Sequence, residues 1–95
     1  MTRAEAEKLS LLFLKMIADL GQSVRYVRDH DSTEAFEAYR KVAGTLMGNL
    51  VCDASQPLLE RFPELVPDYL GGPYKVSEDA YHPLFYDCQE EPVIP

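Results

Sequence analysis

Four side chains in the sequence could support nucleophilic catalysis or metal binding: Cys52, Cys88, His30 and His82. A catalytic cysteine needs a base within hydrogen-bond reach and a thiol pKa below its ordinary value. Cys52 follows Val51 in a predicted helix, and we expect a buried, unreactive thiol there. The spacing of His82 and Cys88 is not typical of zinc sites, and no second pair of ligands accompanies them. This pattern predicts neither a nucleophile nor a metal centre.

The glycines and carboxylates also lack the spacing of catalytic or phosphate-binding motifs. Di-metal helical bundles carry a glutamate three residues before a histidine, and neither histidine has one. The pairs Gly44-x-x-x-Gly48 and Gly71-Gly72 do not precede the Lys-Ser/Thr arrangement of a phosphate-binding loop. We therefore predict no catalytic residues, no cofactor and no metal. An enzyme that uses acidic residues or His82 is the less favoured alternative.

Residues 31–52 show the pattern of a long amphipathic helix. Asp31 or Ser32 can cap its start, and apolar residues then recur at spacings of three and four, which places them on one side of a helix. Within this stretch, Gly44 and Gly48 each cost about 1 kcal/mol relative to alanine. We interpret the two glycines as a site where another backbone approaches closely. The alternative is that they are tolerated weak spots.

An earlier helix is predicted to begin at Thr2, which forms a capping-box pattern with Glu5. Only residues 29–31 separate the two helical patterns, so the helices should be antiparallel neighbours. The first helix has a wider apolar surface than one partner helix can cover, because it carries three additional leucines: Leu11, Leu12 and Leu14. This extra surface should meet the C-terminal tail, a third helix or a second subunit.

Prolines and glycines divide the rest of the chain. Pro57 predicts a kink or a new helix start, followed by a short third helix that buries Leu58, Leu59 and Phe62. A residue before proline avoids the helical region, so that helix should end at Phe62. Gly71-Gly72 then suits the left-handed cap that ends a last helical turn. We therefore assign residues 1–70 to a helical domain.

Residues 71–95 form a tail of different composition. The segment contains one lysine, five acidic residues and four prolines, and only a brief helix is expected, around residues 77–81. It also carries large aromatic side chains that should be docked rather than left in water, among them Tyr81, Phe85 and Tyr86. The tail should therefore pack in extended form, either on the helices of its own chain or on a neighbouring chain.

Length and charge limit the classes of partner. A chain of 95 residues makes one domain, buries little surface alone and gains from association. The formal net charge of −7 disfavours nucleic acids and anionic membranes, because both repel it. Two cysteines are too few for a disulfide framework, and no signal peptide or membrane span is recognisable. We therefore expect a cytoplasmic protein.

These observations predict an all-α fold: an antiparallel helical hairpin with a short third helix and an extended tail, completing a helical bundle by dimerisation. The predicted function is that of a small non-enzymatic interaction protein, acting as a homodimer or on a protein partner. The alternative is a small-molecule binder with a pocket between helices. The predicted interaction surface comprises Leu11, Leu12, Leu14, Gly44, Gly48, Tyr81, Phe85 and Tyr86.

Overall fold

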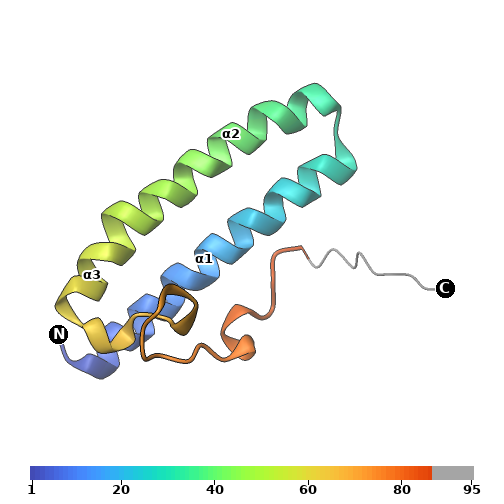
Figure 1. The fold of residues 1–95 in the computed structure, drawn as a ribbon. Helices are drawn as coiled ribbons and strands as arrows, with labels where there is room; N and C mark the ends of the chain where they lie inside the picture. Colours follow the sequence, from blue (N-terminus) through green and yellow to red (C-terminus); the bar gives the residue numbers. More distant parts are fainter. Residues whose placement is uncertain (87–95) are drawn as a thin grey trace.

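Two long antiparallel helices dominate the computed structural model, which describes residues 1–86 (Figure 1). Helix α1 spans Arg3–His30 and helix α2 spans Thr33–Asn49, and the two pack against each other as a hairpin. Within residues 1–86 the structure contains helices, turns and one isolated backbone bridge, but no strand. The predicted all-α hairpin is confirmed.

Side-chain caps fix where both long helices begin. The Thr2 hydroxyl accepts a hydrogen bond from the Glu5 amide at 3.1 Å, and the Glu5 carboxylate accepts one from the Thr2 amide at 2.7 Å. This is the predicted capping box, which satisfies two amides that have no partner inside the helix. Of the two candidate caps for α2, the structure uses Ser32, whose hydroxyl accepts from the Ala35 amide at 3.1 Å.

The helix does not break at Pro57. It continues from α2 through a π-helical segment, η1 (Leu50–Ser55), into the short helix α3 (Gln56–Arg61). A proline ring inside an α-helix clashes with the carbonyl four residues earlier. In the wider π-helical turn, the Gln56 amide donates instead to the Val51 carbonyl, five residues back. The π-helical turn explains why the helix continues past Pro57, where the sequence predicts a kink or a new helix start.

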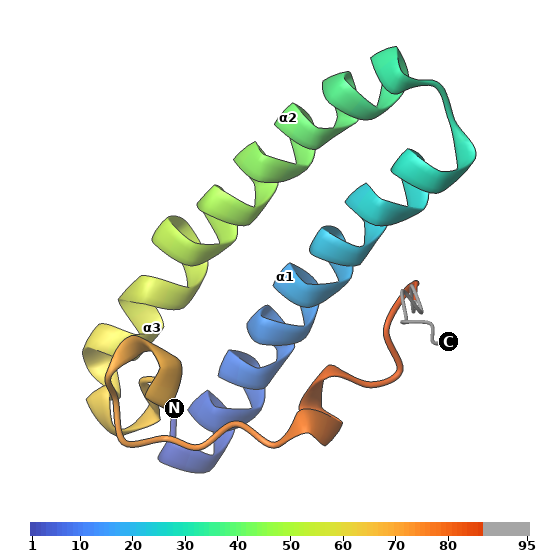
Figure 2. The ribbon, with the colours of Figure 1, turned by 45° about the vertical axis from the view of Figure 1, so that its right-hand side comes forward.

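After α3 the chain forms a compact loop and then returns along α1. Two short 3-10 helices, η2 (Pro63–Leu65) and η3 (Asp68–Leu70), lead to Gly71, which adopts the predicted left-handed conformation (φ +86°). The following segment contains the 3-10 helix η4 (Glu78–Tyr81), close to the predicted brief helix. Both ribbon views place this segment on the side of α1 that faces away from α2 (Figure 1, Figure 2).

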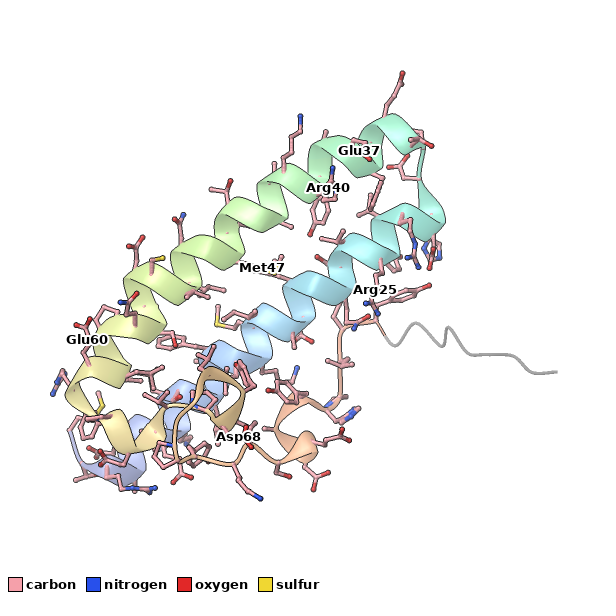
Figure 3. The ribbon with its side chains drawn as sticks, viewed as in Figure 1. Arg25, Glu37, Arg40, Met47, Glu60 and Asp68 are labelled. Carbon is pink, nitrogen blue, oxygen red and sulfur yellow. The ribbon has the colours of Figure 1, made fainter. Side chains whose placement is uncertain are left out.

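The core is concentrated at one end of the hairpin. Ala6, Leu58 and Leu65 are buried there, with Tyr74 and several apolar side chains packed against them. The predicted burial of the third helix is therefore confirmed at Leu58, with Leu59 and Phe62 partly buried beside it. Towards the other end, Met47 lies between the two helices (Figure 3), but it is only half-buried. Much of the hairpin beyond the core is consequently open.

Candidate functional site

An open groove of about 600 Å³ lies between α1 and α2. Met16 and Leu20 of α1 form one wall, and Tyr39 and Leu46 of α2, with Leu50 at the start of η1, form the other. The tail contributes Phe85, which is 59% exposed at the edge of the groove. These side chains present apolar surface to solvent, because the buried core packs against only part of each helix. The groove is therefore a candidate binding surface.

Two sets of hydrogen bonds stabilise the walls of the groove. The hydroxyls of Ser23 and Tyr39 lie 2.7 Å apart and tie α1 to α2. Asp19 accepts a hydrogen bond from Lys15 at 2.7 Å and another from the Phe85 amide at 2.9 Å. Partial burial raises the pKa of Asp19, but these two hydrogen bonds outweigh burial, so the pKa lies below its ordinary value. The one carboxylate lining the groove is thus paired with a cation.

Several large apolar side chains in and beside the groove are exposed. One turn before Leu46 lies Val42, so these two residues share a face of α2. We call the following set the docking face; its members are between 41% and 59% exposed: Met16, Val42, Leu46 and Phe85. Single exposed apolar residues are ordinary, but a contiguous set along two helices is typical of interaction surfaces.

The α2 part of this surface is uncharged along its length. Residues at spacings of three and four form one row on the helix, which contains Ala35, Ala38, Val42, Leu46 and Asn49. The charged residues of α2 lie outside that row. Two of these charged side chains, Glu37 and Arg40, form an exposed ion pair at 2.6 Å (Figure 3). The separation of charge from this row suits contact with another apolar surface.

The tail docks on its own chain as far as it is described. The Tyr74 hydroxyl donates to the Glu7 carboxylate at 2.5 Å, and the Tyr86 hydroxyl donates to Asp29 at 2.8 Å. Tyr26 packs edge-on against both Phe85 and Tyr86, with ring centroids 5.4 and 5.1 Å apart. Of the predicted tail residues, Phe85 and Tyr86 therefore lie together at the far end of α1. The remainder of the predicted tail, 87–95, lies outside the described residues.

The predicted interaction leucines do not share one surface. Leu11 and Leu12 line a shallow cavity beside η4, whereas Leu14 is 8% exposed and lines a different cavity near α3. Tyr81 is half-buried and lies beside Gln22 of α1. Leu11, Leu12 and Leu14 lie within about one turn of α1 but point in different directions, because neighbouring helical residues are about 100° apart.

Gly44 and Gly48 both lie on an exposed part of α2. A β-carbon added at either glycine would meet no atom within 4 Å, so no segment among residues 1–86 approaches closely there. Cys52 is an exposed free thiol, and the prediction that it is buried was wrong. It was judged from its apolar sequence neighbour Val51, yet adjacent residues of a helix point in different directions, and Val51 itself is 45% exposed.

Met16, Val42 and Leu46 were not predicted as interaction residues. Sequence periodicity assigned them to the inner face of the hairpin, because they belong to the apolar stripes. For Val42 and Leu46, the signal in the sequence is the width of the apolar stripe on α2. Its uncharged row of small and apolar residues lies to one side of Phe36 and Ala43, the residues closer to the centre of that stripe.

No cluster of His, Cys, Asp and Glu residues suited to hold a metal ion occurs within residues 1–86. In that same part of the chain, no helix is both long and apolar enough to cross a membrane. No protein-family model, curated protein or solved structure matches the sequence or the fold.

Proposed function

We propose that the protein is a small non-enzymatic interaction protein that forms a homodimer through its docking face. The observation that carries the proposal is the open apolar groove between α1 and α2, together with the exposed side chains of the docking face. A chain of this size covers little of its own apolar surface, and association covers more. Full burial of a docking-face side chain contributes about 1.5–3 kcal/mol, and these are already about half-buried in the single chain, so a dimer gains roughly half of that from each.

A second copy fits this surface by geometry. Two antiparallel hairpins that stack groove to groove, related by a twofold axis, form a four-helix bundle with the apolar residues inside. Ala35 and Ala38 provide small side chains at one end of the α2 row, where a second backbone can approach closely. Leu46 and Val42 provide larger ones in its middle. A twofold contact also uses the same surface on both copies, so the groove of one chain would face the groove of the other.

Electrostatics permit this contact despite the acidic chain. The net charge of −7 opposes self-association at long range, and the same charge supports our proposal that nucleic acids and anionic membranes are not partners. Close to the groove, however, Asp19 is paired with Lys15, and the α2 row carries no charge. We therefore expect the homodimer to tighten as salt screens the distant repulsion.

Sedimentation equilibrium of the full chain and two variants tests the proposal. Leu46→Glu places a carboxylate in the middle of the docking face, and we expect the dimer dissociation constant to rise by about 100-fold or more, because both copies would bury a charge. Thr45→Glu introduces the same charge one residue earlier, on an exposed position outside the row. This matched control should dimerise like the unaltered chain.

A monomer at all concentrations up to the millimolar range would refute the homodimer. Equal weakening by Leu46→Glu and Thr45→Glu would also count against the docking face, since it would indicate a general effect of added negative charge. A dimer that Leu46→Glu leaves intact would place the interface elsewhere, with the exposed face around Gly44 and Gly48 as the next surface to test.

A further inference from the structure

A second cavity, of about 310 Å³, lies near the core end of the hairpin. It is bounded by α1, by the η1 and α3 segments and by the loop Val66–Leu70. Its walls are mainly apolar, with Leu14 and Ile17 from α1, Leu59 from α3 and Val66 from the loop. None of the residues that line it also lines the groove between α1 and α2. The two features can therefore be tested independently.

Two serine side chains in this cavity have no hydrogen-bond partner in the described part of the chain. Ser10 is 5% exposed and Ser55 is 8% exposed, and both line the cavity. Elsewhere the structure pairs helical hydroxyls with backbone carbonyls, as Ser23 does with Leu20 at 2.6 Å. Neither serine hydroxyl makes such a bond, yet neither is wholly enclosed by protein. Each hydroxyl can therefore form a hydrogen bond with a molecule that occupies the cavity.

The charge of the cavity limits that occupant. Among the described residues that line it, none is a lysine, arginine or histidine, and one, Glu60, is acidic. A carboxylate or phosphate group would meet no cation there and would face the negative charge of Glu60. The hydroxyls of Ser10 and Ser55 can instead donate to, or accept from, a neutral hydroxyl or carbonyl group.

We propose that this cavity binds a small neutral amphiphile, whose apolar body contacts Leu14, Ile17 and Leu59 and whose hydroxyl or carbonyl bonds Ser10 and Ser55. An apolar cavity of about 150 Å³ accommodates benzene, so the present volume suits a body of roughly eight to ten carbon atoms. A few polar groups in a mainly apolar pocket are the usual arrangement of small-molecule sites.

Titration with 1-octanol, followed by amide chemical shifts, tests the proposal on the full chain. Octanol should shift the amides of Ser10, Ser55 and Leu59, and octanoate should bind at least tenfold more weakly. Ser10→Ala and Ser55→Ala should each weaken octanol binding by about fivefold, the loss expected for one hydrogen bond. Neither variant should lower the thermal midpoint of unfolding, since neither hydroxyl has a partner to lose. Thr45→Ala, which removes an exposed hydroxyl of α2 that does not line the cavity, should leave octanol binding unchanged.

Three results would overturn this assignment. Octanol that shifts no amide around the cavity would show that the cavity does not hold an amphiphile. Octanoate that binds as tightly as octanol would contradict the argument from charge. A Ser10→Ala, Ser55→Ala double variant that binds octanol like the unaltered chain would show that the serines do not recognise the polar group.

Discussion

Gly72 is the position where adding a single methyl group should damage the structure most clearly. A β-carbon at Gly72 would overlap the carbonyl oxygen of Val66 and come within 2.5 Å of the Val66 β-carbon, where ordinary contacts begin near 3.4 Å. The obstacle is backbone, which cannot move aside as a flexible side chain can. In Gly72→Ala the loop from Val66 to Tyr74 must therefore open.

The cost follows from the bonds that close this loop. The Gly72 amide donates to the Pro67 carbonyl at 2.9 Å, and the Tyr74 amide donates to the Val66 carbonyl at 3.0 Å. Each such bond contributes about 0.5–1.5 kcal/mol, and overpacking adds about 1–3 kcal/mol. Because the same loop positions the buried Leu65 and Pro67, we expect Gly72→Ala to lower the free energy of unfolding by about 2–4 kcal/mol.

Gly48→Ala is the matched control, since it makes the same chemical change at a glycine with no neighbour within 4 Å. Alanine is the better helix former by about 1 kcal/mol, so this variant should be more stable than the unaltered chain. Urea denaturation followed by circular dichroism measures both effects. Stability unchanged in Gly72→Ala would refute the loop geometry. Destabilisation of Gly48→Ala that grows with protein concentration would show that α2 packs against another chain at this glycine.

Three further variants test the core, the tail and the acid dependence of stability. Leu58→Ala should lower the free energy of unfolding by about 2–5 kcal/mol, because it empties space beside Ala6 and Leu65; a loss below about 1 kcal/mol in urea denaturation would contradict the assigned core. Tyr74→Phe removes the hydroxyl bonded to Glu7 and should cost about 1 kcal/mol by the same assay, whereas no cost would show that this bond does not hold the tail. The pKa of Asp19 is lower in the folded chain than its ordinary value, so ionised Asp19 contributes stability at neutral pH that is lost as pH falls through the folded-state pKa. Asp19→Asn should therefore lose less stability than the unaltered chain between pH 5 and pH 2, measured as the thermal midpoint of unfolding at each pH. Parallel pH profiles of the two proteins would contradict this role of Asp19.

Local signals predicted most of the helical architecture. The capping box at Thr2, the short connector before Ser32 and the left-handed Gly71 each depend on interactions between residues close in sequence. The same holds for the burial of Leu58, since an amphipathic helix presents its apolar face to the core. The continuation of the helix past Pro57 was not predicted. It depends on a π-helical turn, a backbone adjustment that has no distinct sequence pattern.

The candidate site was predicted only in part. Phe85 was identified because a large aromatic residue in a proline-rich segment needs a surface on which to pack, and it lies at the edge of the groove. Met16 and Leu46 belong to the apolar stripes of the two helices, and periodicity gives the direction of a stripe but not how far the partner helix covers it. Ser10 and Ser55 are about 45 positions apart and line the same cavity only because the chain folds back on itself. No local sequence pattern encodes such a long-range contact.

The homodimer is tested most directly by an isotope-filtered NOE experiment on a mixed sample. One half of the chains carries carbon-13 and the other half does not, so that only contacts between copies are observed. We expect NOEs between chains from the methyl groups of Met16, Val42 and Leu46. If a sample that is dimeric by sedimentation shows no such NOEs from these methyl groups, or shows them only from residues around Gly44 and Gly48, the groove between α1 and α2 is not the dimer interface.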